Sequence, residues 1–330
     1  MCEINEKSDP LVSILIPCYN HERYIADCIN SIIKQTYDNI EVLICDDCSQ
    51  DSSWQKLTEM GEMLKSRFPY VSLKRNSENL GVTKNLNRML KEAQGKYIKE
   101  LATDDFLEES AIEDFVQYCE NDVSIDVAVC NGWIVPDEAH FPLRSKAPNK
   151  VAYKSKVNFD FPHQELLEAL YQNNFIFAPG TFMRKQVFLE HGYYDETMYG
   201  EDWDYWLRLA EDGQSKFGYL DKCLVAYRQS DNSITSLANN SGFDNRHLRL
   251  YKFQGDVLEK YRDKVSDSVY ASAKLHHIID ANKRAKKYQL ENLLKITQME
   301  FKEYRVWKVL PLRDYIFFVK NVLFRRLRLS

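Results

Sequence analysis

Two adjacent acidic residues, Asp104 and Asp105, follow a short segment at residues 97–101 that is predicted to form a β-strand. Carboxylates at the carboxyl end of a parallel strand suit a divalent cation that carries a phosphorylated ligand. A hard cation needs several oxygen ligands, and the phosphates can supply those that the protein does not. An Asp-Asp pair in a loop is most often a solvated turn, so its meaning depends on what lies beside it.

Two earlier segments end in polar residues in the same way. The β-branched run at residues 12–16 stops at Pro17 and is followed by Tyr19, and the run at 40–45 ends at Asp46-Asp47. In a parallel sheet the carboxyl ends of neighbouring strands meet at one edge, and the ligand binds beyond that edge. We therefore expect a site assembled from several loops.

The elements that position these loops alternate as an α/β fold with a mostly parallel sheet requires. Asn20 is well placed to cap the first helix, whose apolar residues recur at helical spacing from Ile25. Strands are predicted at residues 12–16, 40–45, 71–75, 97–101 and 126–130, and helices at 25–33, 54–67, 82–93 and 108–120.

A second acidic pair, Glu201-Asp202, precedes a predicted aromatic helix at residues 203–211. A carboxylate there can take the proton from an attacking hydroxyl group as a new bond forms. It can equally cap the helix, and capping is the simpler interpretation of these residues alone.

Taken in order, the segments resemble the nucleotide-sugar-binding half of the family 2 glycosyltransferases, which have the GT-A fold. The resemblance covers residues 1–240, and its specificity lies in the ordered set rather than in any one piece. Its motifs are Ile-Pro-Cys-Tyr-Asn at 16–20, Asp-Asp-Cys-Ser-Gln-Asp at 46–51, Asn-Leu-Gly at 79–81, Gly-Lys-Tyr-Ile at 95–98, Asp-Asp at 104–105, Gly-Tyr-Tyr-Asp-Glu at 192–196, the segment 200–209 and Ala-Tyr-Arg at 226–228.

The resemblance implies that Asp105 is the direct protein ligand of Mg or Mn and that Asp104 lies closer to the ribose of the nucleotide. Many relatives carry a further acidic residue where this chain has Ala102, and many carry a histidine where it has Ser230. The cation is therefore expected to be held mostly by the diphosphate of the donor.

Recognition of the nucleoside is assigned by the same resemblance to the first two loops. Asp47 would accept the imide N–H of uracil, and Pro17 and Tyr19 would flank the base or ribose. Asp46 is expected only to form an Asx turn. Lys84 follows the 79–81 turn, where relatives carry a basic residue near the nucleotide, although a solvated helix lysine fits the position as well.

The family match favours Asp202 over simple capping as the catalytic base, with Glu201 orienting the base or the acceptor. One base and no second nucleophile predict a single displacement that inverts the anomeric configuration.

The length of 330 residues accommodates a catalytic domain at residues 1–240 and a helical region at 241–330. The nucleotide-binding half is expected at about 1–131 and the acceptor half at 132–240. The last segment, 305–330, has a local charge of +6 against −11 for the rest and predicts a basic amphipathic helix. This tail could lie on an anionic membrane, or pack on its own domain or on a second subunit of an oligomer.

The net charge of −5, without a basic patch interleaved with aromatic residues before residue 300, argues against nucleic acid as a partner. The spacing of the eight cysteines gives little support for disulfides or a metal site. Five of them are expected to be reduced core residues: Cys18, Cys28, Cys119, Cys130 and Cys223. The polar start of the chain and the absence of a long apolar run predict a cytoplasmic protein. The resemblance and the basic tail add the expectation that it is peripheral on the inner face of the cytoplasmic membrane.

Together these features predict an inverting, metal-dependent glycosyltransferase of the bacterial surface-polysaccharide type. It would use a nucleotide sugar, with UDP favoured, and a saccharide or lipid-linked saccharide acceptor. Two alternatives are a nucleotidyltransferase that makes a nucleotide sugar and a non-catalytic phosphoacceptor or nucleotide-binding domain. The first normally shows a Gly-rich basic loop after its first strand, and the second leaves residues 192–209 unexplained.

Overall fold

The computed structural model describes residues 9–143, 150–151, 159–229 and 243–303. The chain divides into two compact units, each described by itself below. Unit 1 comprises residues 1–161 and 176–236, and unit 2 comprises residues 162–175 and 237–330. Residues 162–175, which the sequence analysis kept with the acceptor half, thus group with the C-terminal helices. The division at residue 240 stays a prediction.

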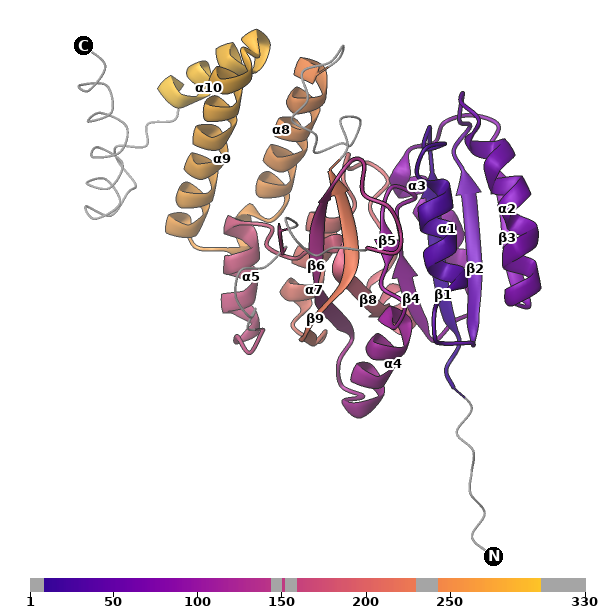
Figure 1. Ribbon diagram of the computed structural model, residues 1–330. Coiled ribbons are helices and arrows are strands. Elements are labelled where there is room, and N and C mark those ends of the chain that lie inside the picture. The colour runs from indigo at the N-terminus through magenta and orange to yellow at the C-terminus, as the bar shows by residue number, and fades with distance from the viewer. Residues whose placement is uncertain (1–8, 144–149, 152–158, 230–242, 304–330) are drawn as a thin grey trace, which may run out of the picture. The chain divides into compact units, whose positions relative to one another are not determined.

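Unit 1 is built on one mixed sheet, with the strand order β3-β2-β1-β4-β8-β6-β9-β5 and with β7 paired to β6 (Figure 1). The four strands from β3 to β4 are parallel to one another, as predicted, whereas β8 runs antiparallel to both β4 and β6. The strands are β1 Val12–Cys18, β2 Ile40–Asp46, β3 Tyr70–Arg75, β4 Tyr97–Glu100, β5 Phe106–Leu107, β6 Val127–Pro136, β7 Lys150–Val151, β8 Thr181–Arg184 and β9 Phe217–Gln229.

Helices cover this sheet on its two faces. The helix α1 packs beside α2 and β5, whereas α3 packs against β1 and β2. The helices of unit 1 are α1 Ile25–Ile33, α2 Ser53–Arg67, α3 Val82–Glu92, α4 Ala111–Asn121, α6 Lys185–His191 and α7 Asp202–Asp212, with the short 3-10 helix Ala178–Gly180 before β8. All four helices predicted in the first 131 residues are confirmed to within a few residues.

The prediction that Asn20 caps α1 is wrong. The residue preceding α1 is Tyr24, which makes no side-chain capping bond, and the amide of Tyr24 donates to the carbonyl of His21 in a turn that separates Asn20 from the helix. Asn20 itself has a positive φ of 54°. Asparagine tolerates this conformation better than most residues, which suits it to the sharp turn after β1.

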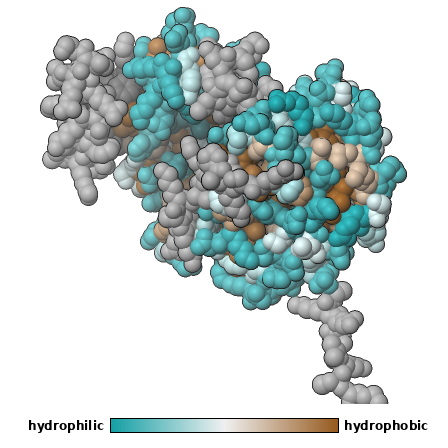
Figure 2. All heavy atoms as spheres, in the orientation of Figure 1, coloured by the Kyte–Doolittle hydropathy of each residue, from teal (hydrophilic) through white to brown (hydrophobic). Residues whose placement is uncertain are grey.

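The core of unit 1 lies between the sheet and its helices. Every residue of β2 is buried, and six of the seven residues of β1 are buried, so both strands are covered on both faces as parallel strands usually are. The apolar face of α1 joins them through Ile25, Cys28, Ile29 and Ile32. This packing fixes the strand ends from which the candidate site is built. On the face seen in Figure 2, the coloured residues are mostly hydrophilic, with apolar residues between the polar ones.

Unit 2 is helical, as predicted for the C-terminal region. Its helices are α5 His163–Gln172, α8 Phe243–Lys260, α9 Asp267–Tyr288 and α10 Glu291–Glu303, with a 3-10 turn at Arg262–Lys264. Helix α9 contacts α5, α8 and α10. Its small residues Ala281 and Ala285 form a buried cluster with Tyr251, Leu290 and Leu293.

Within the described ranges, no helix combines the length and the apolar character that crossing a membrane requires. The basic tail at 305–330 and Ser230 both lie outside the described residues.

Candidate functional site

The predicted site residues gather where β1, β2 and β4 end. The register pairs Cys18 of β1 with Asp46 of β2, and Leu15 of β1 with Glu100 of β4, so the three carboxyl ends face one edge of the sheet (Figure 1). This is the edge at which ligands bind in parallel α/β sheets.

The loops after β1 and β2 are held together by hydrogen bonds. The amide of Asn20 donates to Ser49 Oγ at 2.9 Å, and the amide of Gln50 donates back to Asn20 Oδ1 at 2.8 Å. Pro17 is half-buried, and the Tyr19 side chain lies on the surface, 42% exposed. The ring of Tyr19 is therefore accessible to a ligand at the strand ends, as the sequence analysis requires.

Asp47 is buried and accepts three hydrogen bonds. Its Oδ1 accepts from Asn76 Nδ2 at 2.7 Å and from the amide of Leu80 at 2.9 Å, and its Oδ2 accepts from the amide of Gly81 at 2.8 Å. Gly81 has a φ of 83°, which favours glycine. Asp47 thus fixes the turn before α3, a function that the sequence analysis did not assign to it. Its contact with a nucleobase stays a prediction.

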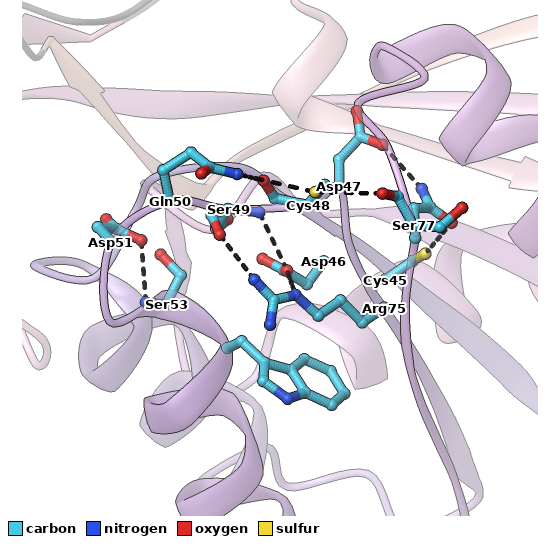
Figure 3. Close-up of polar contacts among 12 residues, drawn as sticks. Cys45, Asp46, Asp47, Cys48, Ser49, Gln50, Asp51, Ser53, Arg75 and Ser77 are labelled. Carbon is cyan, nitrogen blue, oxygen red and sulfur yellow. Dashed lines mark hydrogen bonds and ion pairs between the residues drawn. The ribbon is translucent and has the colours of Figure 1, made fainter.

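Asp46 forms the predicted turn and also an ion pair that was not predicted. Its Oδ2 accepts from the amide of Ser49 and from Arg75 Nε, both at 3.1 Å. Arg75 also donates to the carbonyl of Ser49 at 2.8 Å, so it joins the end of β3 to the loop after β2 (Figure 3). Asp46 Oδ1 has no hydrogen-bond partner among the described residues, although it is fully buried.

The acidic pair after β4 is held by a buried arginine from β9. The amide of Arg228 donates to Asp105 Oδ1 at 2.9 Å, and Arg228 Nε donates to the carbonyl of Asp104 at 2.8 Å. The same guanidinium pairs with Asp27 of α1 at 3.0 Å and lies 4.8 Å from the centre of the Tyr24 ring. Arg228 thus holds the Asp104-Asp105 loop in position through these contacts.

The surroundings of Asp105 disfavour its negative charge. Burial, followed by the charge of Asp104, raises the pKa of Asp105 well above its usual range, whereas Arg228 and Lys99 oppose this shift. Lys99 is fully buried, and its Nζ donates to the carbonyls of Glu100 and Pro179 at 2.6 and 2.7 Å. Burial lowers the pKa of Lys99 to about 8.

The donor chemistry of this loop fits a divalent cation. Two adjacent carboxylates that repel each other offer hard oxygen ligands, and a cation between them would relieve the repulsion. No group of three or more His, Cys, Asp or Glu side chains in the described ranges is arranged to hold a metal ion. Further oxygen ligands would have to come from a bound diphosphate, as expected above. Lys84 is exposed on α3, and no contact here tests its predicted role.

Glu201 and Asp202 lie at the start of α7, where the sequence analysis placed them. Asp202 is the first helical residue, and its Oδ1 accepts from the amide of Trp203 at 2.6 Å. Burial, then the negative charges of Asp202 and Glu100, raise the pKa of Glu201 to about 8. Both predicted carboxylates therefore share one electrostatic environment.

Glu100 also belongs to this cluster, which was not predicted from the sequence. Burial raises the pKa of Glu100 to about 7; Tyr194 and Lys99 oppose this shift, and the charge of Asp202 adds to it. The hydroxyl of Tyr194 donates to Glu100 Oε1 at 2.8 Å. Glu100 ends a strand shortly before Asp104, and this position could have indicated from the sequence that it lies at the site.

Comparison with known proteins places these features in a family. The sequence profile described as Glycosyl transferase family 2 matches residues 13–192. An uncharacterized glycosyltransferase of Haemophilus influenzae is 26% identical over 313 residues, which cover 93% of this chain and 91% of the relative. Glycosyltransferase GlyA of Streptococcus pneumoniae is 29% identical over 238 residues, 69% of this chain and 32% of that protein.

Two solved structures share the fold. The first is S. aureus TarS 1-349 in complex with UDP-GlcNAc, with a TM-score of 0.59, 18% identity and coverage of 87% of this chain and 80% of that chain. The second is the mannosyltransferase PcManGT from Pyrobaculum calidifontis in complex with GDP-Man and Mn2+. It has a TM-score of 0.55, 14% identity and coverage of 97% and 83%.

Proposed function

Because the chain belongs to glycosyl transferase family 2 and has the GT-A fold, we propose that it is an inverting, metal-dependent enzyme that transfers a sugar from a UDP-sugar to a saccharide hydroxyl. That it is a glycosyltransferase agrees with its relatives. This disfavours the nucleotidyltransferase and the non-catalytic domain considered above.

The arrangement of carboxylates at the end of β4 carries this proposal. Glu100 ends the strand and leads into the Asp104-Asp105 loop, and the charge of Asp202 affects its pKa. This supports a site in which one group would bind the diphosphate and another would accept a proton. Single displacement at an anomeric carbon requires this combination.

The donor would bind along the strand ends. Tyr19 and Pro17 would contact the nucleoside beside the turn that Asp47 orders, and the Asp104-Asp105 loop would face the diphosphate. A bound Mg or Mn ion would stabilise the negative charge that develops on the departing diphosphate. Arg228 keeps the loop in place throughout, because its guanidinium is fully buried.

Asp202 would accept the proton of the acceptor hydroxyl group. Glu201, with a pKa raised to about 8, is largely protonated near neutral pH, whereas Glu100, with a pKa raised to about 7, is about half protonated there. Partial or full protonation of these two neighbours would reduce the negative charge beside Asp202, which is the carboxylate proposed as the general base. Glu201 would then orient the acceptor or the base as a hydrogen-bond donor.

We favour UDP over GDP as the nucleotide because the loop motifs match the uracil-binding pattern noted above. A neighbour in complex with UDP-GlcNAc is consistent with this choice, whereas the neighbour with GDP-Man makes a GDP-sugar the alternative. The proposed acceptor is a lipid-linked saccharide of a bacterial surface polysaccharide, used at the inner face of the cytoplasmic membrane. The charge pattern of the 305–330 tail supports this location.

A donor panel tests the proposal. Purified protein is incubated with UDP- and GDP-sugars, Mg or Mn, and saccharide acceptors, and both nucleotide release and the new glycosidic bond are measured. The expected result is transfer from a UDP-sugar, lost with EDTA, to a product of inverted anomeric configuration by NMR. Retained configuration, or full activity in EDTA, would contradict the corresponding part of the proposal.

A further inference from the structure

The loop at residues 192–201 connects α6 to α7 and brings the proposed base to the site. Tyr194 turns inward from this loop and is only 4% exposed. Its ring packs against Phe188 and Tyr205, with centroid distances of 5.6 and 4.8 Å. The buried ring thus fixes one point of the loop to the aromatic core beneath it.

Asn87 of α3 clamps the main chain at the same point. Its Oδ1 accepts from the amide of Tyr194 at 3.0 Å, and its Nδ2 donates to the carbonyl of Tyr194 at 2.9 Å. The same Nδ2 group lies 3.0 Å from Glu196 Oε1. Because Asn87 is buried, these bonds are shielded from competing water.

The hydroxyl of Tyr194 then reaches across to the sheet. It donates to Glu100 Oε1 at 2.8 Å, and Glu100 is the last residue of β4. The strand leads from there into the Asp104-Asp105 loop, which faces the donor in the proposed function. One hydrogen bond therefore joins the segment that carries Asp202 to the segment that would hold the diphosphate.

The charges around Glu100 explain why its carboxylate depends on the hydrogen bond from Tyr194. Lys99 of the same strand and the hydroxyl of Tyr194 stabilise the ionised carboxylate, whereas the negative charge of Asp202 on α7 destabilises it. The negative charge of Glu100, after burial and the charge of Asp202, likewise raises the pKa of Glu201. Without the Tyr194 hydroxyl, Glu100 would lose its hydrogen-bond donor while still lying beside like charges, and the two segments would tend to separate.

We propose that Tyr194 and Glu100 are a pair of positioning residues, whose hydrogen bond holds the loop that carries Asp202 at a fixed place beside the end of β4. The consequence for catalysis rests on the proposed function, because it takes Asp202 as the base. Correct placement of a base relative to the reacting atoms contributes strongly to rate, and small displacements are costly. The pair acts on the transfer step and does not contact the nucleoside.

A matched pair of tyrosines tests this directly. Tyr205 belongs to the same aromatic cluster and is fully buried, but its hydroxyl has no hydrogen-bond partner among the described residues. Tyr194→Phe and Tyr205→Phe therefore each remove one buried hydroxyl, and only the first removes the bond to Glu100. We expect Tyr194→Phe to lower kcat about tenfold or more, with UDP affinity unchanged within about twofold, and Tyr205→Phe to leave both unchanged.

Hydrogen exchange reports the position of the loop without any need for transfer. Amides of residues 195–201 should exchange faster in Tyr194→Phe than in Tyr205→Phe, as measured by mass spectrometry. Glu100→Gln keeps a side-chain oxygen that can accept from Tyr194, so it should retain slow exchange and most of kcat, whereas Glu100→Ala should lose both. These two variants decide the matter if Tyr194→Phe does not fold.

Several results would overturn the pairing. The pairing is refuted if Tyr194→Phe and Tyr205→Phe have equal kcat and equal hydrogen exchange. It is also refuted if Tyr194→Phe loses UDP affinity and thermal stability in parallel. Equal behaviour of Glu100→Gln and Glu100→Ala would refute it as well. Failure of the wild-type enzyme to transfer sugar from any donor would instead refute the proposed function, and the exchange of residues 195–201 would still decide the pairing.

Discussion

At the scale of single residues, the candidate site depends on carboxylates whose charges affect one another. The negative charge of Asp202 helps to raise the pKa of both Glu100 and Glu201, and the charge of Asp104 does the same for Asp105. Such like-charge groups favour either protonation or a bound cation. The two acidic pairs can therefore differ in function, one in proton transfer and the other in binding metal and diphosphate.

Asp105 provides a test of the second function. Asp105→Asn retains an oxygen for the amide of Arg228 but removes the charge, so Mg-supported UDP binding should weaken about tenfold or more. Turnover should fall about a hundredfold or more. Calorimetry of UDP binding with and without Mg provides the measurement, and Asp221→Asn, an exposed carboxylate on β9, is the control. An unaltered Mg effect would exclude Asp105 as a metal ligand.

The sequence identified these acidic pairs but not the partners that orient them. The predicted acidic residues lie next to the ends of strands or helices that apolar periodicity predicts. They are Asp47, Asp104, Asp105, Glu201 and Asp202. Their partners are distant in the sequence: Arg228 lies 123 residues from Asp105, and Tyr194 lies 94 residues from Glu100. No local pattern encodes such contacts, because they exist only after the sheet has assembled.

At the scale of elements, the four parallel strands β1 to β4 and the start of β6 were predictable, and the short strands of the sheet were not. Strands β1 and β2 are clear apolar runs, and β3 and β4 follow from the alternation of strands with helices. Strands β5 and β7 have only two residues each, and β8 is a short strand that pairs with both β4 and β6. Short strands depend on tertiary pairing rather than on their own sequence, so periodicity does not reveal them.

Arg228 links four elements, and its replacement should destabilise unit 1. Arg228→Met would remove the guanidinium that pairs with Asp27 and donates to the carbonyls of Asp104 and Asp137. We expect a loss of about 3 kcal/mol in the free energy of unfolding, because one partner of a buried ion pair is removed. Urea denaturation measures this loss.

The control for this variant is Arg23→Ala. Arg23 pairs with Asp137, but its side chain is 66% exposed, so the change should be within about 0.5 kcal/mol. Equal effects of the two substitutions would show that Arg228 does not hold the loop in the manner described.

The contact between the end of β4 and the start of α7 predicts a pH dependence of stability. Folding raises the pKa of Glu100 to about 7 and that of Glu201 to about 8, from an ordinary value of 4.5. The stabilising contribution of a raised carboxyl pKa is present at low pH and is lost as pH rises through the folded value. Unit 1 should therefore lose stability between about pH 5 and 8 through these groups.

The substitution Glu201→Gln replaces one of these two carboxyl groups with an amide, which cannot ionise. The stability of this variant relative to wild type should increase as pH rises from 5 to 8.5, as measured by chemical denaturation at each pH. A difference that stays constant across this range would contradict the assigned environment of Glu201.

At the scale of the whole molecule, the chain combines a GT-A unit with a helical unit and a basic C-terminal segment. The proposed location at a membrane depends on the segment 305–330. Deleting residues 315–330 removes Lys320, Arg325, Arg326 and Arg328, each expected to contribute about 1 kcal/mol near an anionic surface. The truncated protein should lose binding to phosphatidylserine vesicles in a flotation assay, and the full chain should lose it as salt rises.

Activity on a short water-soluble acceptor should survive this truncation, because all proposed site residues precede residue 236. Absence of vesicle binding by the full chain, together with dissociation of an oligomer or unfolding on truncation, would show instead that the segment packs against protein.

The central claim is that Asp202 is the base of a sugar-transfer reaction, and one kinetic comparison tests it most directly. Asp202→Asn keeps the shape of the side chain but abolishes its basicity, and Asp212→Asn changes a carboxylate at the other end of α7. With the donor selected from the panel, kcat should fall about a hundredfold or more in Asp202→Asn while the affinity for UDP stays unchanged, and Asp212→Asn should match wild type. A folded Asp202→Asn enzyme that transfers sugar at the wild-type rate would contradict the claim.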